Sequence, residues 1–310
     1  MPAVLFRSGN DNPVAWREAL TKRIPGLELR VYPDIGDPEE IDFALVWKAP
    51  HGTFNGMTNL KAICSLGQGV DHIFEDPDLP DAPQIVRIVD PWMARAMAEW
   101  VLLQVLRFHR QGPAYEQAQK DGRWIKLDAE ETSTRRIGIM GMGALGAEAA
   151  RVISSLGFDV AGWSRSRKDI PGVKSFAGSN EMDAFLGRTD ILCCLLPLTP
   201  ETTDLIDADL LGKLPNGAFV VNSGRGAQLV EEDLLAALDS GHIAGAALDV
   251  FRVEPLPEAH PFWSHPKVQV WPHVSAQTNA DSAADQIAEN IRRLRAGQEL
   301  LNTVGRDRGY

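Results

Sequence analysis

The chain has 310 residues, of which 44% are hydrophobic and 24% charged, and its formal net charge is −11. This length exceeds what one hydrophobic core usually supports, so we expect two domains with a ligand cleft between them. The net negative charge repels polyanions and argues against nucleic acid as a partner. No apolar run is long enough for a membrane span, and the first residues lack the regions of a secretory signal. We therefore expect a cytoplasmic protein without a membrane partner.

Three cysteines, Cys64, Cys193 and Cys194, stand in apolar, strand-like runs. Their odd number, with two of them adjacent, fits reduced thiols better than a disulfide framework. Free cysteine is among the residues most often buried, so we expect all three to be core residues. No metal site is assigned.

Two series of β-rich runs alternate with helix-compatible stretches. The first series, between Ala3 and Val89, predicts a parallel α/β sheet and consists of AVLFRS, LELRVY, FALVW, AICSLG and QIVRIV. The second series, after Arg135, has six runs: RRIGIMG, DVAGWS, ILCCLL, AFVVNSG, GAALDV and VQVWPH. Six parallel strands suit a doubly wound nucleotide-binding domain.

Two longer segments have the apolar spacing of helices. Residues 91–111 begin with a proline, which favours a helix start, and residues 280–296 are closed by Gly297. If the second helix packs on the first domain, that domain is discontinuous. We expect one domain formed by 1–97 plus 279–310 and another formed by 98–278.

A glycine-rich turn joins the run RRIGIM to a helix-compatible stretch and reads Gly141-Met-Gly143-Ala144-Leu145-Gly146. Between a strand and a helix, this pattern is typical of dinucleotide binding. Gly141 makes the tight turn, Gly143 lets the backbone approach a pyrophosphate, and Gly146 lets the helix pack on the strand. The N–H groups at the start of the helix then bind the phosphates. A glycine-rich turn without a ligand is the alternative.

The next strand, DVAGW, ends where an NAD enzyme usually carries an acid for the ribose 2′-hydroxyl. Here Ser164, Arg165, Arg167 and Lys168 follow instead. A hydroxyl and cations suit a 2′-phosphate, which a carboxylate would repel. We expect NADP(H) to be preferred, with NAD(H) possible. A solvated basic loop is the alternative.

Arg225, Glu254 and His273 each follow a strand-like run of the second series. Ligands of open α/β sheets bind outside the carboxyl ends of the strands, so all three can reach one cleft. The planar guanidinium of Arg225 can bind a carboxylate through two parallel N–H donors and polarise a neighbouring carbonyl. His273 can give or take a proton near neutral pH, and a paired Glu254 favours its imidazolium form. Taken singly, each residue could be structural, whereas the set predicts reduction of a 2-keto acid.

The same residues lie in segments that resemble the D-isomer-specific 2-hydroxyacid dehydrogenase family. These segments are GMGALG, Asn222-Ser-Gly-Arg225-Gly, Asp249-Val-Phe-Arg-Val-Glu254-Pro-Leu-Pro and Pro272-His273. Within the family, the chain is most similar to the glyoxylate and hydroxypyruvate reductases. That likeness is carried by LVW at 45–47, GWSRSRK at 162–168, PGVKSFAG at 171–178 and the final DRGY.

The resemblance implies a Rossmann dinucleotide-binding domain, a flavodoxin-like substrate domain, and Arg225, Glu254 and His273 as the catalytic set. It implies that the nicotinamide half of the cofactor is lined by Leu196, Pro197, Asn222, Ser223, Gly224, Asp249 and Ser275. In the first domain, it implies that N–H groups of Gly69 and Val70 bind the substrate carboxylate beside Trp47. Gln68 departs from the small residue usual in the family. Residues 112–124 correspond to the family's dimer arm, which implies a homodimer.

We therefore expect NADPH-dependent reduction of glyoxylate to glycolate and of hydroxypyruvate to D-glycerate, with His273 as general acid. Other members of the family are alternatives. Glu254 argues against formate dehydrogenase, and the absence of a regulatory domain argues against phosphoglycerate dehydrogenase. D-Lactate dehydrogenase usually keeps the ribose-binding acid that is missing here, although it shares the catalytic residues. A nucleotide-sensing binding protein without significant turnover is the alternative from another class.

Overall fold

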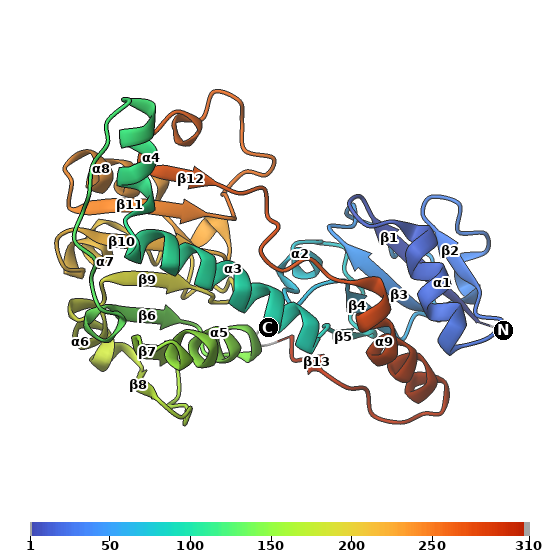
Figure 1. The fold of residues 1–310 in the computed structure, drawn as a ribbon. Helices are drawn as coiled ribbons and strands as arrows, with labels where there is room; N and C mark the ends of the chain where they lie inside the picture. The colour runs from blue at the N-terminus through green and yellow to red at the C-terminus, as the bar shows by residue number, and fades with distance from the viewer. Residues whose placement is uncertain (1, 307–310) are drawn as a thin grey trace. The chain divides into compact units, whose positions relative to one another are not determined.

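In a computed structural model, which describes residues 2–306, the chain forms two compact units (Figure 1). Unit 1 comprises Met1–Met93 and Gln277–Tyr310, and unit 2 comprises Ala94–Ala276. Each unit contains a sheet of mainly parallel strands with helices, which confirms the predicted α/β class. The final DRGY, on which part of the resemblance rests, lies outside the described residues.

The sheet of unit 1 has the flavodoxin-like strand order β2-β1-β3-β4-β5, with β13 added beside β5. Its strands are β1 (Ala3–Ser8), β2 (Leu29–Val31), β3 (Ile41–Trp47), β4 (Ala62–Ser65), β5 (Gln84–Val86) and β13 (Thr303–Val304). All pairs are parallel except β13 with β5, which is antiparallel. The sequence predicted the five parallel strands but not β13, because two residues are too few to show a period.

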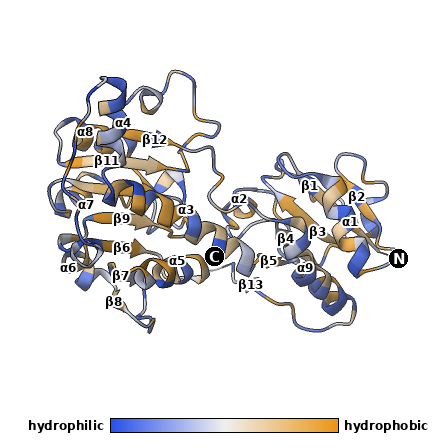
Figure 2. Ribbon diagram, viewed as in Figure 1, coloured by the Kyte–Doolittle hydropathy of each residue, from blue (hydrophilic) through white to orange (hydrophobic). Residues whose placement is uncertain are grey.

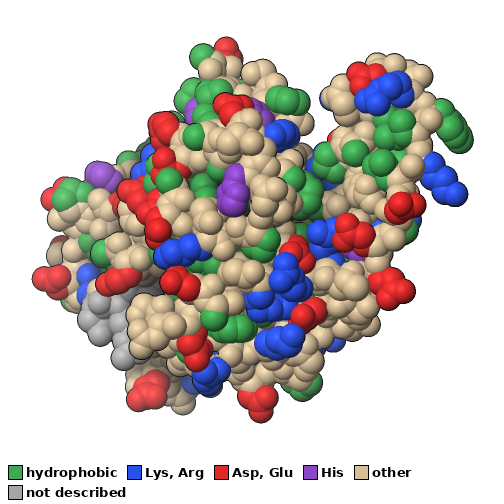
Figure 3. Space-filling view, turned by 90° about the vertical axis from the view of Figure 1, so that its left-hand side faces the viewer, with side chains coloured by type: hydrophobic (Ala, Val, Ile, Leu, Met, Phe, Trp, Pro, Cys, Tyr) green, Lys and Arg blue, Asp and Glu red, His purple; other side chains and the backbone are tan. Residues whose placement is uncertain are grey.

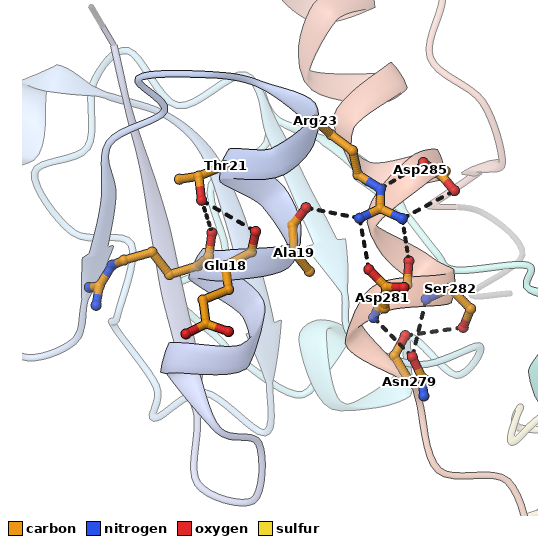
Figure 4. Close-up of polar contacts among 9 residues, drawn as sticks. Glu18, Ala19, Thr21, Arg23, Asn279, Asp281, Ser282 and Asp285 are labelled. Atoms are coloured by element: carbon orange, nitrogen blue, oxygen red, sulfur yellow. Dashed lines mark hydrogen bonds and ion pairs between the residues drawn. The ribbon is translucent and has the colours of Figure 1, made fainter.

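Among residues 2–306, three α-helices belong wholly to unit 1: α1 (Pro13–Arg23), α2 (Asp71–Phe74) and α9 (Ala280–Arg295). The predicted helix at 280–296 is α9, and it packs against α1. Figure 4 shows Arg23 of α1 between Asp281 and Asp285 of α9, with nitrogen–oxygen distances of 3.0 and 2.6 Å. Asn279 caps α9 by accepting from the N–H groups of Asp281 and Ser282. Helix α9 is thus part of the same unit as α1, although 258 positions separate Arg23 from Asp281 in the sequence.

Unit 2 has seven parallel strands in the order β8-β7-β6-β9-β10-β11-β12, the doubly wound Rossmann order with one strand added. They are β6 (Arg136–Met140), β7 (Asp159–Ser164), β8 (Val173–Ala177), β9 (Ile191–Cys194), β10 (Ala218–Asn222), β11 (Ile243–Leu248) and β12 (Val268–Val270). The prediction of six strands was wrong by one, since β8 was missed. This edge strand is nowhere fully buried, and Lys174 is exposed. Its sequence, VKSFA, therefore does not need the apolar run by which the other strands were recognised.

The helices of the remaining chain are α3 (Pro91–His109), α4 (Gly112–Lys120), α5 (Ala144–Ser155), α6 (Met182–Gly187), α7 (Ala208–Lys213) and α8 (Glu231–Asp239). The helix predicted over 91–111 is α3, which ends two residues earlier, before Gln111 takes a left-handed φ of 57°. The boundary between the two units falls within this helix.

Buried hydrophobic clusters cover both faces of the unit 2 sheet. Figure 2 shows hydrophobic residues along its strands. Met140, Leu192 and Cys194 pack into the cluster on one face, while Ile139 and Cys193 pack into the other. Alternate residues of a strand therefore enter opposite layers, as expected for a parallel sheet covered on both sides.

The three cysteines are buried and free, which confirms the prediction of core thiols. Burial raises the pKa of the Cys64 and Cys194 thiols to about 12, and burial also raises the pKa of the Cys193 thiol. These groups are therefore protonated and unreactive at neutral pH.

Figure 3 shows acidic and basic side chains interspersed over the face turned to the viewer. Among the helices of residues 2–306, none combines the length and the apolar character that a membrane span needs.

Candidate active site

The glycine turn lies between β6 and α5 in unit 2, as the sequence predicts. Gly141 has a φ of +98°, and a Cβ there would lie 2.5 Å from the carbonyl oxygen of Leu195. A Cβ on Gly146 would lie 1.9 Å from the carbonyl oxygen of Gly141. These two positions therefore require glycine because of backbone conformation and close packing.

Gly143 is different, because its φ of −78° is ordinary and a Cβ there would meet no protein atom within 4 Å. Neither the fold nor the backbone explains a glycine at this exposed position. Gly143 is the N-cap of α5, and no side chain caps the helix there. The N-terminus of this 12-residue helix thus offers N–H groups and a positive dipole end beside open space. That arrangement fits the approach of a pyrophosphate.

The basic segment follows β7, directly beside the strand that precedes the glycine turn. The Ser164 hydroxyl donates to the carbonyl of Ser166, at 2.7 Å. Arg167 donates to the carbonyl of Ser175, at 2.6 Å, and forms an ion pair with Glu181. Arg165 and Lys168 are exposed. The end of β7 therefore presents cations and a hydroxyl, with part of the Arg167 charge offset by Glu181.

Asp249 links the ends of three neighbouring strands, β10, β11 and β12. It follows β11 and is fully buried, and its carboxylate accepts from the N–H groups of Val274 and Ser275 at 2.8 and 3.1 Å. The hydroxyl of Ser223, after β10, lies 3.5 Å from the same carboxylate and contacts the hydroxyl of Ser275. Burial raises the pKa of Asp249, against the opposing effect of these hydrogen bonds and of His273.

His273 and Glu254 form a pair at this edge, with His273 Nδ1 at 3.0 and 3.2 Å from the two carboxylate oxygens. Glu254 also accepts from the N–H of Phe251, at 3.1 Å, which fixes the orientation of its carboxylate. His273 has a left-handed φ of 56°. Such a conformation costs free energy and persists only where the surroundings impose it, as Asp249 does through the next two N–H groups. The side chains are 31% and 19% exposed, so the pair is accessible at the surface of the unit.

Arg225 follows β10 and is half-buried. Its guanidinium donates to the carbonyl of Gly224 at 2.9 Å, and its backbone carbonyl accepts from the side chain of Asn222 at 3.2 Å. Asn222 also accepts from the N–H of Gly224, at 3.1 Å. The asparagine therefore shapes the turn that presents Arg225.

Gln228 is a buried residue of the site that the sequence analysis missed. Its amide nitrogen donates to the carbonyls of Leu196 and Pro197, at 3.0 and 2.9 Å, and its oxygen accepts from the N–H of Arg225, at 2.8 Å. One side chain thus joins the turn after β9 to the turn after β10. The only signal in the sequence is a polar residue within the otherwise small and apolar stretch GAQLV.

In unit 1, Trp47 ends β3 and the segment 67–70 follows β4. Within residues 2–306, no hydrogen bond uses the backbone N–H of Gln68, Gly69 or Val70. A Cβ on Gly67 would lie 2.8 Å from the Trp47 ring, so the indole packs directly on this segment. Consecutive N–H groups without an internal partner make a binding site for an anion.

The predicted residues of unit 2 thus gather at the carboxyl ends of neighbouring parallel strands, and Trp47, Gly69 and Val70 gather at the corresponding ends in unit 1. In the described part of the chain, no group of three or more His, Cys, Asp or Glu side chains is arranged to hold a metal ion.

Comparison with known proteins links this arrangement to a family. Residues 102–275 match the model of the D-isomer specific 2-hydroxyacid dehydrogenase NAD binding domain. A Glyoxylate/hydroxypyruvate reductase A from Serratia proteamaculans is 42% identical, with 99% of each chain covered.

Two solved structures are similar over nearly the whole chain. A D-isomer specific 2-hydroxyacid dehydrogenase from Xanthobacter autotrophicus, in complex with NADPH and MES, is 45% identical with a TM-score of 0.96, covering 100% of this chain and 99% of its own. An NADPH-dependent glyoxylate/hydroxypyruvate reductase from Sinorhizobium meliloti, in complex with NADP and sulfate, is 39% identical with a TM-score of 0.92, covering 99% and 100%.

Proposed function

Because the chain belongs to the D-isomer-specific 2-hydroxyacid dehydrogenases, we propose that it reduces glyoxylate to glycolate and hydroxypyruvate to D-glycerate with NADPH. The observation that carries the proposal is the His273–Glu254 pair, which lies at the same sheet edge as Arg225 and the glycine turn. The names of the relatives support the two substrates, and the complexes of the similar structures support the cofactor. Unit 2 is then the cofactor-binding domain and unit 1 the substrate domain.

The cofactor proposal rests on the fit of the turn to a pyrophosphate. Gly143 leaves room for it, and the first N–H groups of α5, including those of Ala144 and Leu145, bind it. Ser164, Arg165, Arg167 and Lys168 bind the 2′-phosphate. The nicotinamide half contacts Leu196, Pro197, Asn222, Ser223, Gly224, Asp249 and Ser275. When bound, NADPH supplies the hydride.

His273 is the proposed general acid. Glu254 accepts from Nδ1, which assigns the proton on that nitrogen and leaves Nε2 to deliver a proton to the forming alkoxide. Arg225 binds the substrate carboxylate and polarises the keto oxygen, since its fork carries several donors in one plane. The Glu254 carboxylate stabilises the imidazolium that donates the proton.

The substrate carboxylate is bound by the N–H groups of Gly69 and Val70, which have no hydrogen-bond acceptor within the described residues. Trp47 limits the size of the substrate side chain, which favours glyoxylate and hydroxypyruvate over longer keto acids.

We also propose a homodimer in which residues 112–124 contact the partner subunit, since Trp124 is 102% exposed and Tyr115 is 39% exposed. Light scattering of the wild type and of Trp124→Ser tests it, with a dimer expected for the wild type only.

Two sets of variants test the roles at the site. Arg225→Ala should raise the KM for glyoxylate and lower kcat, while His273→Ala should chiefly lower kcat, by about a hundredfold or more. Arg225→Lys is the control, because it keeps the positive charge but loses the planar guanidinium that can bind a carboxylate through two N–H donors. Equal effects of Arg225→Ala and His273→Ala on both parameters would contradict this division.

The basic segment is tested separately with Arg165→Asp combined with Lys168→Ala. The KM for NADPH should rise about tenfold or more while that for NADH stays unchanged, because only NADPH carries the 2′-phosphate. Arg167→Ala is a comparison variant, and its effect should be smaller than that of the double variant because it removes one cation and introduces no negative charge. An unchanged KM for NADPH in the double variant would exclude this segment as the phosphate site.

A further inference from the structure

We propose that His72 and Ser65 are positioning residues that hold the segment 67–70 through one directional chain of hydrogen bonds. The inference rests on the proposed function, which assigns the N–H groups of this segment to the substrate carboxylate. All of the residues that carry it belong to unit 1.

The direction of each hydrogen bond follows from the donors and acceptors. The backbone N–H of Lys48 donates to His72 Nδ1, at 3.2 Å. The Ser65 hydroxyl donates to the carbonyl of Gly69, at 2.6 Å, so its proton is committed to that bond. Ser65 Oγ must therefore accept from His72 Nε2, 3.1 Å away, and it also accepts from the N–H of Gly67, at 3.2 Å.

These contacts assign one protonation state to His72, the neutral imidazole with its proton on Nε2. Nδ1 has to accept from Lys48, whereas Nε2 has to donate to Ser65. If the ring were protonated, its Nδ1–H group and the Lys48 N–H group would both be donors and would face each other. His72 is 8% exposed and Ser65 is fully buried, so water cannot readily replace the lost partners.

The chain of hydrogen bonds joins two structural segments that are distant in sequence. Lys48, with a left-handed φ of 45°, follows the end of β3, and Gly69 lies in the segment after β4. Through His72 and Ser65, the conformation after Trp47 is tied to the carbonyl of Gly69. The Gly69 carbonyl and the Val70 N–H belong to one planar peptide group, so fixing the carbonyl also fixes the direction of the Val70 N–H. The bond from the Gly67 N–H to Ser65 Oγ holds the start of the same segment and so limits the freedom of the Gly69 N–H between them.

Packing around Trp47 supports the same role. The Trp47 and His72 rings meet edge to face, with centroids 4.6 Å apart and an interplanar angle of 61°. Trp47 also lies so close to Gly67 that a Cβ on Gly67 would be 2.8 Å from the indole. His72 therefore positions both the proposed carboxylate-binding segment and the residue that limits substrate size.

The test uses His72→Phe, which keeps a planar ring but removes both hydrogen bonds, and Ser65→Ala, which removes the hydroxyl. The matched control is His109→Phe in unit 2, because His109 is also buried, at 3% exposure, and also meets an aromatic ring edge to face, at 5.0 Å. Two further variants each restore one of the two hydrogen bonds of His72, to Lys48 or to Ser65. His72→Asn places an acceptor near Nδ1, and His72→Gln places a donor near Nε2.

We expect His72→Phe and Ser65→Ala each to raise the KM for glyoxylate about tenfold. The KM for NADPH should stay within a factor of two, since the proposed cofactor site lies in unit 2. The double variant should be about as impaired as the worse single variant, because both substitutions break one chain. His72→Gln should recover more activity than His72→Phe. An unchanged KM for glyoxylate in folded His72→Phe and Ser65→Ala, or equal increases in both KM values, would overturn the proposal.

Backbone hydrogen exchange distinguishes this inference from the proposed function. The amides of residues 67–70 should exchange faster in His72→Phe and Ser65→Ala than in the wild type and in His109→Phe. If the wild type reduces neither glyoxylate nor hydroxypyruvate, the proposed function fails, and exchange alone then decides whether the chain of hydrogen bonds holds the segment. Unchanged exchange at residues 67–70 would overturn the inference whatever the activity.

Discussion

Alanine substitution at Gly143 and Gly146 separates a glycine kept for a ligand from one kept for the fold. A Cβ on Gly146 would lie 1.9 Å from the Gly141 carbonyl oxygen, which the backbone has to relieve by moving. Overpacking of this kind costs about 1–3 kcal/mol. In a unit of this size, that corresponds to a fall in Tm of roughly 3 to 10 °C.

Gly143→Ala should leave the fold nearly intact, since a Cβ there meets no protein atom within 4 Å and φ is −78°. Alanine is a poorer N-cap than glycine, so a cost of about 0.5 kcal/mol is expected. The added methyl group would instead occupy the space of the pyrophosphate. We expect the Kd for NADPH to rise about tenfold or more, which is roughly 1.4 kcal/mol.

The assays are thermal unfolding of the cofactor-free protein and titration of NADPH followed by its fluorescence. Gly146→Ala serves as the control, because it should lose stability whether or not the protein binds a dinucleotide. Wild-type NADPH affinity in Gly143→Ala would exclude Gly143 from the pyrophosphate site, since the open space beside it would then have no role in binding.

Three further predictions concern single groups. Burial raises the pKa of Asp249 above its unfolded value of about 3.9, so its contribution to stability is fully present below that value and is lost as pH rises through the folded pKa. The Tm of the wild type relative to Asp249→Asn should therefore decrease as pH rises from about 4, and a pH-independent difference would contradict this. Glu254→Gln should lower kcat about a hundredfold with little change in the KM for glyoxylate, because the imidazolium loses its carboxylate; a kcat near that of the wild type would remove Glu254 from the mechanism. The three buried thiols should not react with a disulfide reagent at neutral pH until the protein is unfolded, and a fast reaction in the native state would contradict their high pKa.

The sequence predicted the features that are local in the chain. The glycine turn, the strand before it, the helix after it and the polar residues after β10, β11 and β12 follow from patterns of a few residues. Because the carboxyl ends of parallel strands meet at one edge, a correct order of elements was enough to expect Arg225, Glu254 and His273 together.

Features that depend on distant contacts were not predictable in this way. Gln228 acts through bonds to a turn more than 30 residues earlier, and His72 through a bond to a backbone group 24 residues earlier. The strand β8 forms because β7 offers it a partner, not because its own residues are apolar. Such residues become visible only when the fold has brought their partners together.

We conclude that this chain is an NADPH-dependent reductase of small 2-keto acids. The most direct test is the initial rate of cofactor oxidation by the wild type with glyoxylate and with hydroxypyruvate, comparing NADPH and NADH at equal concentrations. We predict oxidation with both acids and a preference for NADPH of about tenfold or more, roughly 1.4 kcal/mol. Absence of oxidation with either acid and either cofactor would contradict the claim.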